Sequence, residues 1–273
     1  MPLQKLLLKP GVNRENTRYT SEGGWYESDK VRFRQGMPEK IGGWERISSD
    51  FFLGVCRSLH TWVTLANTTV TSVGTHLKYY LENGGAYYDI TPIRATVTLT
   101  NPFATVSGSA IVTVTDANGG YRNGDYVTFS NASAVGGLTL NGEFQITYGV
   151  GNTYVITASS TANGSATGGG TVTATYQINS GSELEAALAG WSAAKWGEGT
   201  WGNGGEGVES LRIWSQGNFG EDLILGHRGG ALFFWDASEN TPLNTRATLL
   251  NAETGASNVP TIQNIILVSD INR

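Results

Sequence analysis

An internal repeat constrains the fold of this 273-residue chain more than any other feature. Residues 58–62 (Ser-Leu-His-Thr-Trp) and Gly74 are echoed by residues 210–214 (Ser-Leu-Arg-Ile-Trp) and Gly226, every match at an offset of 152 positions. Both copies then continue through a glycine turn to an aromatic run that ends in aspartate, at residues 87–89 and 233–236. We therefore interpret each copy as most of a four-stranded antiparallel sheet of the kind that forms one blade of a β-propeller.

A segment of different composition separates the two copies. Residues 101–178 contain four charged side chains, whereas nine of the eighteen Lys and Arg residues lie in the first fifty positions. Removing 93–178 as an insert shortens the repeat interval to 66 residues, which is still longer than the roughly 40–50 of common blades. We therefore expect an N-terminal charged arm (1–50), a first propeller-like segment (51–92), a small inserted β domain (93–178), a Trp/Gly-rich loop (179–208) and a second propeller-like segment (209–273).

Two blades cannot close a propeller, because closed propellers use about four to eight blades. The apolar strand that the sequence predicts at 265–271 would also leave an unpaired edge, which folded proteins usually cover. We therefore expect the gene product to continue beyond residue 273.

Alternating apolar and polar residues dominate the insert, for example around Val112 and Val114. This period of two predicts half-buried strands. Asn-Gly pairs at 118–119, 123–124 and 141–142 favour type I′ hairpin turns, and the glycines at 168–170 predict a flexible hinge or a hairpin tip. The sequence thus predicts an all-β chain, a partial propeller-like platform with an inserted small β-barrel or sandwich, and one short helix over 182–189.

Charge, cysteine content and motifs exclude several classes of function. The net charge of −5 disfavours a protein that grips nucleic acid tightly, and the single Cys56 excludes a disulfide framework and a zinc ribbon. A G-x-G-x-x-G match at 197–202 lacks the strand–helix context of a dinucleotide site, and no paired nucleophile and base is evident. We therefore predict no enzyme activity, no cofactor and no metal site.

Five tryptophans and three basic residues are the candidate interaction residues. Trp25 and Trp44 in the arm, with Trp191, Trp196 and Trp201 in the Trp/Gly-rich loop, are interpreted as anchors at subunit interfaces; sugar or base stacking is the alternative for the loop. Alternation with Val and Phe places Lys30, Arg32 and Arg34 on one strand face, where they would contact phosphate or an acidic patch. The simpler interpretation is a solvated face balanced by nearby acidic residues, including Glu27 and Glu39.

The N-terminal arm and one motif in the second copy carry a family resemblance. The strings at 3–15, 23–34 and 38–44, together with Trp-Ser-Gln-Gly-Asn-Phe-Gly-Glu-Asp-Leu at 214–223, resemble structural proteins of tailed phages and prophages. They are similar to the tail nozzle, or packaged-DNA stabilisation protein, of short-tailed phages. The resemblance covers the arm and both propeller-like segments and assigns no individual residue a role.

What the resemblance implies is a virion structural protein, assembled in the host cytoplasm and located in the tail. Such subunits form a homo-oligomeric ring below the portal and adaptor, contact tail fibre or spike proteins, and retain and then conduct double-stranded DNA. The mildly acidic charge agrees with a conduit, because a wall of like charge does not bind the moving duplex.

Two other classes of function stay open at this point. One is a receptor-binding or glycan-binding β module that uses the tryptophans of the loop and the Thr-rich insert. The other is a polysaccharide-cleaving tail enzyme, which requires two carboxylates about 5–9.5 Å apart in a cleft. The close acidic pairs available for it are at 183/185 and 206/209.

Overall fold

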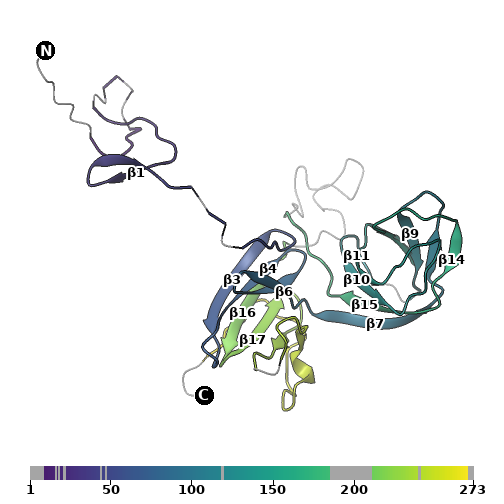
Figure 1. The fold of residues 1–273 in the computed structure, drawn as a ribbon. Helices are drawn as coiled ribbons and strands as arrows, with labels where there is room; N and C mark the ends of the chain where they lie inside the picture. Colours follow the sequence, from purple (N-terminus) through teal and green to yellow (C-terminus); the bar gives the residue numbers. More distant parts are fainter. Residues whose placement is uncertain are drawn as a thin grey trace, which may run out of the picture. The chain divides into compact units, whose positions relative to one another are not determined.

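The computed structural model describes residues 9–15, 17, 19–20, 23–43, 45–46, 48–117, 120–184, 211–238 and 241–269, with residues 148–150 described by their backbone alone. The chain divides into two units, residues 1–47 and 48–273. Figure 1 shows both units, with some of their strands labelled.

The first unit is organised around one β-hairpin. Strands β1 (Val31–Arg34) and β2 (Met37–Lys40) pair antiparallel. The two residues between them, Gln35 and Gly36, both have positive φ, as a type I′ turn requires. Trp25 packs against this hairpin, with its ring centroid 6.0 Å from that of Phe33 in an edge-on arrangement.

The first copy of the repeat forms a four-stranded antiparallel sheet, called here the first repeat sheet. Its strands are β3 (Cys56–Val63), β4 (Thr69–Thr75), β5 (Tyr79–Asn83) and β6 (Ala86–Asp89), in the spatial order β3-β4-β5-β6. The turn between β5 and β6 uses Gly84 and Gly85, both with positive φ. The glycine turn expected here is therefore confirmed.

The second copy forms a sheet of the same design, called here the second repeat sheet. It contains β16 (Trp214–Phe219), β17 (Asp222–His227), β18 (Phe233–Trp235) and β19 (Thr248–Leu249), in the order β16-β17-β18-β19. A short 3-10 turn, η1 (Leu250–Ala252), follows β19. Each repeat sheet is thus a meander in which every strand pairs with the next along the chain.

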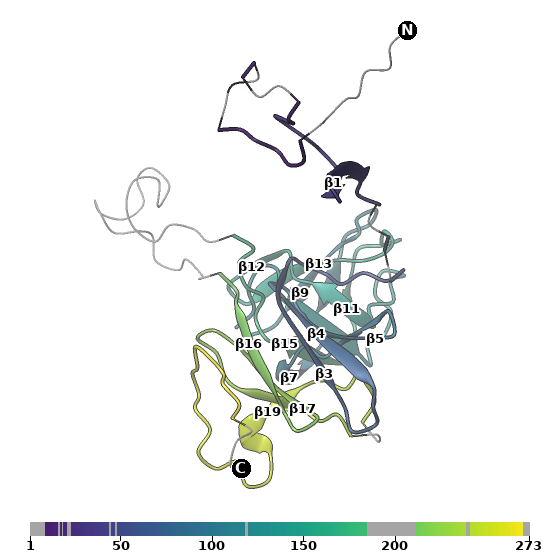
Figure 2. The ribbon, with the colours of Figure 1, turned by 90° about the vertical axis from the view of Figure 1, so that its left-hand side faces the viewer.

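The two repeat sheets pack against each other and share one hydrophobic core, with β16 beside β3 (Figure 2). Trp214 lies on Gly74, where a Cβ atom would stand 2.7 Å from the indole Cδ1, and its Nε1 donates to the carbonyl of Thr75 at 2.6 Å. Trp62 makes the reciprocal bond, donating from Nε1 to the carbonyl of Glu221 at 2.7 Å. The buried residues of this core are Trp62, Val70, Tyr79, Leu81, Ile90, Ile178, Trp214, Leu223, Leu225, Phe233, Trp235 and Ala247.

The pairing of strands within the two repeat sheets does not follow the constant offset of 152 positions that relates the two copies in sequence. Gly74 pairs with Ser58 and Gly226 pairs with Ser215, so the paired serines are 157 positions apart. Trp62 and Trp214 therefore occupy different places along their strands, because the turn after β16 is shorter than the turn after β3. The aromatic run at 233–235 is likewise a third strand, equivalent to β5, and its expected match with 87–89 in the fourth strand is wrong.

The insert forms two antiparallel sheets around a second core. One sheet has the order β11-β10-β15-β7 and the other the order β12-β13-β9-β8-β14. Alternate residues of both sheets, such as Leu99, Val114, Phe129 and Ile156, meet in that core, so the insert is a sandwich of two sheets. The strands are β7 (Ile93–Thr100), β8 (Phe103–Thr105), β9 (Ile111–Thr115), β10 (Tyr126–Ser130), β11 (Gly142–Gln145), β12 (Tyr148–Val150), β13 (Thr153–Thr157), β14 (Ala166–Gly168) and β15 (Thr171–Gln177).

The glycines of the insert serve connections other than those expected. Positions 123–124 join β9 to β10, which lie in different sheets, and 141–142 lead into β11. The glycines 168–170 also cross from one sheet to the other, and a Cβ at Gly169 would stand 2.6 Å from the ring of Phe103. A crossover this tightly packed is neither a hinge nor a hairpin tip. Of the expected turns, 118–119 lie outside the described residues.

The prediction of an all-β chain is confirmed. Among the described residues, helical structure is limited to the three-residue η1, and the antiparallel sheets form no closed barrel. Most of the short helix expected at 182–189 lies outside the described residues; Ser182 itself forms a β-bridge with Leu211. The strand expected at 265–271 is wrong over its described part, 265–269, where the backbone pairs with no other strand. No described helix has the length and apolar character that crossing a membrane requires.

Candidate functional site

The arm residues predicted as contact sites lie on and beside the β1–β2 hairpin. Arg32 and Arg34 alternate with the half-buried Val31 and Phe33 and are exposed. Lys30 precedes the strand with a positive φ, and its carbonyl accepts a hydrogen bond from the backbone of residue 41 at 2.9 Å. Strand alternation therefore places Arg32 and Arg34, but not Lys30, on one face.

Acidic partners neutralise part of this basic surface. Arg32 pairs with Glu39 across the hairpin at 3.0 Å, and the hydrogen bond that it donates to Glu39 raises the pKa of Arg32. Arg14 pairs with Glu27, also at 3.0 Å. Glu39 thus balances one residue of the predicted basic face, whereas the ion pair of Glu27 is with Arg14, outside that face; the predicted phosphate or acidic-patch contact stays a prediction.

Of the five tryptophans predicted as interface anchors, the structure describes one. Trp25 is half-buried against Phe33, and its indole Nε1 has no hydrogen-bond partner within the described part of the chain. Trp44, Trp191, Trp196 and Trp201 lie outside the described residues. Their role as interface anchors stays a prediction.

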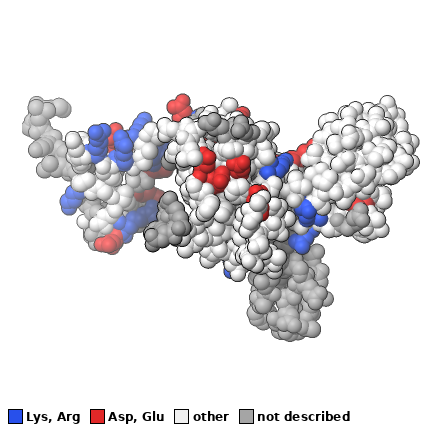
Figure 3. Space-filling model, turned by 90° about the horizontal axis from the view of Figure 1, so that it is seen from below, with Lys and Arg blue, Asp and Glu red and all other residues white. Residues whose placement is uncertain are grey.

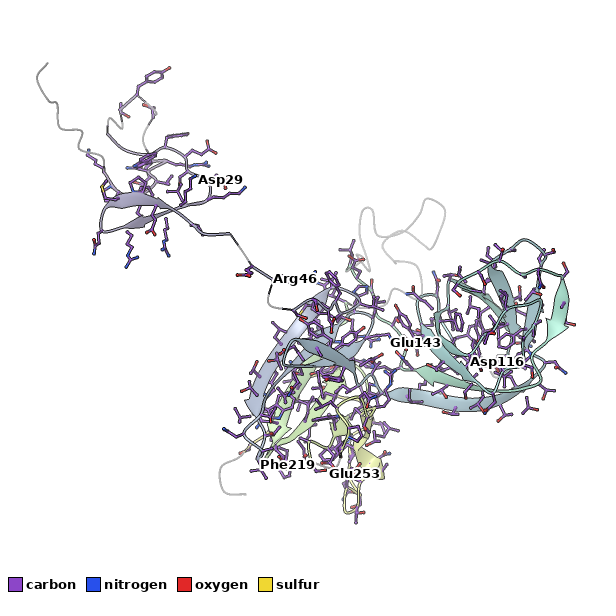
Figure 4. The ribbon with its side chains drawn as sticks, viewed as in Figure 1. Asp29, Arg46, Asp116, Glu143, Phe219 and Glu253 are labelled. Atoms are coloured by element: carbon purple, nitrogen blue, oxygen red, sulfur yellow. The ribbon has the colours of Figure 1, made fainter. Side chains whose placement is uncertain are left out.

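A cluster of four charged side chains brings together both repeat sheets and the insert. Lys78 precedes β5 and Asp89 ends β6 in the first repeat sheet, Glu143 lies on β11 of the insert, and Arg246 precedes β19 in the second repeat sheet. Figure 4 labels Glu143 on the side of the insert that is nearest the repeat sheets. We call these four residues the junction cluster.

Lys78 is the centre of the junction cluster. Its side chain is 3% exposed, and Nζ donates to Asp89 Oδ2 at 2.7 Å and to Glu143 Oε1. The same ammonium lies 4.4 Å from the ring centroid of Tyr126, which adds a cation–π contact with the insert. A buried lysine is therefore satisfied by partners from the first repeat sheet and from the insert together.

Arg246 closes the cluster from the second repeat sheet. Its Nη1 donates to Asp89 Oδ1, and its Nη2 lies 3.6 Å from Glu143 Oε2. Thr91 donates to Asp89 Oδ1 from both its backbone nitrogen (3.0 Å) and its hydroxyl (2.6 Å). Two cations thus face two carboxylates, and the cluster is balanced in charge.

The electrostatics of Asp89 favour a permanent anion. Burial alone would raise the pKa of this carboxyl, but Arg246 and Lys78 outweigh burial and hold the pKa below its ordinary value. A general acid must carry a proton near its working pH, which requires the opposite shift. The arrangement therefore suits holding three structural elements together, and it does not suit proton transfer.

A second polar junction lies between the insert and the chain that leaves it. Asp125, fully buried, accepts hydrogen bonds from the backbone of Ser180 at 2.8 Å and from the side chain of Asn179. Burial is the main reason that its pKa is raised. Arg212 donates to the carbonyl of Asn179, and burial lowers the pKa of its guanidinium to about 10.

The insert has few charged residues, and two of them belong to these junctions. Of its four charges between 101 and 178, Glu143 and Asp125 serve the two junctions, and Asp116 is buried and accepts from the hydroxyl of Tyr176 at 2.8 Å. The face of the insert that is visible in Figure 3 is largely uncharged. Sequence reasoning noted the scarcity of charge but missed this use of it; an acidic residue in an otherwise uncharged β domain was the available signal.

His76 and His227 make contacts that stabilise the fold. His76 Nδ1 accepts from the backbone of Val55 at 3.0 Å, and the ring of His227 meets that of Trp214 edge-on at 5.8 Å. Burial lowers the pKa of both histidines, that of His227 to about 4. In the described part of the chain no three His, Cys, Asp or Glu side chains are grouped to hold a metal ion.

Comparison with known proteins gives a distant similarity to solved structures. No protein-family model matches the chain, and neither does any curated protein. Among solved structures, a phage phi92 endosialidase aligns over 73% of this chain with 17% sequence identity and a TM-score of 0.30. The aligned region spans 30% of the endosialidase chain.

Proposed function

We propose that this protein is a virion structural component of a phage tail, a subunit of the ring-shaped nozzle or hub below the portal and adaptor. It would retain packaged DNA and conduct it during ejection, and it would contact fibre or spike proteins at its outer side. The sequence strings at 3–15, 23–34, 38–44 and 214–223 support this identity through their resemblance to such proteins.

The observation that carries the proposal is the stacking of the two repeat sheets. Both are four-stranded meanders, and each donates a tryptophan N–H to a backbone carbonyl of the other. A β-propeller consists of four-stranded meanders packed face to face in this way, and its role in an assembly depends on its shape and rigidity. Such a fold suits a rigid ring around a passage.

The charge distribution also favours a mechanical role. The buried ionic groups of the junction cluster are paired with each other, and Asp89 is held as an anion. The net charge of −5 and the largely uncharged insert provide little attraction for DNA phosphates. A duplex can slide past a wall that does not bind it.

Virions of the encoding phage test this function. We expect antibody against the protein to label the tail in negative-stain images, at the end of the portal. Particles lacking the protein should package DNA and then lose it, because the exit is no longer closed; particles lacking only a tail fibre are the control. Label elsewhere on the particle, or stable DNA retention without the protein, would contradict the proposal.

The insert gives a specific reason for a second candidate, a glycan-binding module. Hydroxyl side chains cover the face of its β10-β15-β7 strands that is turned away from the core, in cross-strand rows such as Thr96–Thr175–Thr128. The members of this hydroxyl face are Thr96, Thr98, Thr100, Thr128, Ser130, Thr171, Thr173 and Thr175. An uncharged face of donors and acceptors fits a neutral polysaccharide.

A glycan array separates the two candidates. If the insert is a receptor module, the whole chain binds neutral glycans, and T98K combined with T173K abolishes the signal. T153K, on the opposite sheet, is the matched control and should keep it. Absence of binding to any glycan on the array leaves the nozzle as the supported function.

A further inference from the structure

Three arginines line one segment of the chain, residues 177–183, which begins where β15 ends. One comes from β7 of the insert, one from β3 of the first repeat sheet, and one lies two residues before β16 of the second repeat sheet. Each guanidinium donates to a backbone carbonyl of the segment. The pairs are Arg94 with Gln177 (3.4 Å), Arg212 with Asn179, and Arg57 with Glu183. We call the three arginines the arginine row.

Backbone carbonyls satisfy hydrogen bonds of the arginine row but not its charge. Among the described residues, no carboxylate forms an ion pair with any of the three guanidiniums. Asp125 acts on Arg94 and Arg212 through space, but its oxygens accept hydrogen bonds from amide groups. The row therefore differs from the junction cluster, where two cations face two carboxylates.

Two N–H groups of the row are also without a partner. Arg57 Nε and Arg94 Nη2 are buried and make no hydrogen bond within the described part of the chain. The pKa of His76 reports the same excess of positive charge. Burial is the main cause of its lowered pKa; Glu183 opposes burial, whereas Arg57 and Arg212 add to its effect. Because a half-buried charge without a counter-charge is costly, the row calls for a negative group from outside these residues.

We propose that the arginine row binds a carboxylate-rich peptide segment of a partner protein, whose side chains supply the missing negative charge. Guanidinium and carboxylate groups match through two parallel N–H···O bonds, and arginine is enriched at protein interfaces for this reason. The three side chains are half-buried, which suits a narrow, extended peptide better than the wide and stiff surface of a DNA duplex. The inference goes beyond the proposed function, because it identifies the chemistry of a partner and not a place in the virion.

Binding of hexaglutamate to the whole chain tests the site. Fluorescence anisotropy of the labelled peptide at about 0.15 M ionic strength, where distant exposed charges are screened, should show saturable binding with a dissociation constant below ~1 mM. R57Q and R94Q should each raise this constant about 10-fold, because each removes charge-assisted hydrogen bonds. K40Q removes an exposed cation of the arm and is the control, which should bind like the wild type.

The pKa of His76 gives a readout that a purely structural role of the arginines would not change. Carboxylates bound at the row offset the positive charge near this imidazole, so hexaglutamate should raise its pKa in an NMR titration. Hexaglutamine, which is uncharged, should leave the pKa unchanged. R94K keeps the charge but loses the paired N–H groups, so it should weaken binding less than R94Q. Thermal melting of each variant checks that it is folded.

Each of the other results overturns the proposal. These are no saturable binding of hexaglutamate, equal binding by R57Q, R94Q and K40Q, or a pKa of His76 that does not respond to the peptide. A short DNA duplex is the second probe. If the duplex binds more tightly than hexaglutamate and R57Q and R94Q weaken its binding, the row is a phosphate contact and the assignment to an acidic peptide is wrong.

Discussion

The indole nitrogen of Trp214 donates a 2.6 Å hydrogen bond to the backbone carbonyl of Thr75. A side chain of the second repeat sheet thus satisfies a backbone acceptor of the first repeat sheet. The same ring rests on Gly74 and meets Tyr79 edge-on, with ring centroids 4.7 Å apart. Because a buried carbonyl without a partner is costly, this residue fixes both the spacing of the sheets and their register.

Replacing Trp214 with Phe tests the hydrogen bond. A phenyl ring keeps an aromatic side chain above Gly74 but is smaller than the indole, and the carbonyl of Thr75 loses its donor. We expect a loss of about 1–3 kcal/mol in the free energy of unfolding, measured by urea denaturation. Trp235 is the matched control: its Nε1 donates to the carbonyl of Thr245 within the second repeat sheet's own segment. W235F should cost a similar amount without loosening the joint between the sheets, which hydrogen exchange at β3 would report.

Gly74→Ala tests the close approach of the two sheets. The new methyl group would stand 2.7 and 2.8 Å from two ring atoms of the buried Trp214, and it would also press on Ser58 Oγ of the neighbouring strand β3. Overpacking of this kind costs about 1–3 kcal/mol, so we expect a lower urea midpoint. Gly164→Ala is the control, because no atom lies within 4 Å of its Cβ position. Equal stability of the two variants would contradict the packing described here.

His227 predicts a dependence of stability on pH. Burial, with a contribution from Arg212, lowers the pKa of His227 from 6.5 to about 4. Between these values the unfolded chain binds a proton that the folded chain does not, so stability is complete above pH 6.5 and falls as the pH falls toward 4. The loss is on the order of 3 kcal/mol. H227Q should flatten this part of the profile in urea titrations, and parallel profiles for the two proteins would refute the assignment.

The sequence predicted the elements of this fold better than their pairing. Alternation marked Val112 and Val114 as strand residues, and the repeat at Gly74 and Gly226 marked two meanders. Register depends on turn length, and the two-residue turn after β16 shifts the strands relative to the copy at β3. A constant offset in sequence therefore did not imply equivalent places in space for the two tryptophans.

Sheet membership and the junction cluster were beyond sequence reasoning for a related reason. The Asn-Gly pair at 123–124 looks like a hairpin turn, yet it carries the chain from one sheet to the other. Lys78 and Glu143 are 65 positions apart, and only the docking of the insert brings them together. Local patterns specify strands, whereas contacts at this separation depend on tertiary packing.

Lys78→Met tests whether the junction cluster holds the insert to the repeat sheets. The variant keeps the bulk of the buried side chain but leaves Asp89 and Glu143 facing Arg246 alone, and breaking a buried ion pair in this way costs about 3–5 kcal/mol. Adding Glu143→Leu removes one charge of each sign and retains the Asp89–Arg246 pair, so the double variant should be more stable than Lys78→Met in urea denaturation. Arg228→Met, at an exposed cation, is the control and should stay within about 0.5 kcal/mol of the wild type. A loss under about 1 kcal/mol for Lys78→Met, or no recovery in the double variant, would show that the cluster does not hold the elements together.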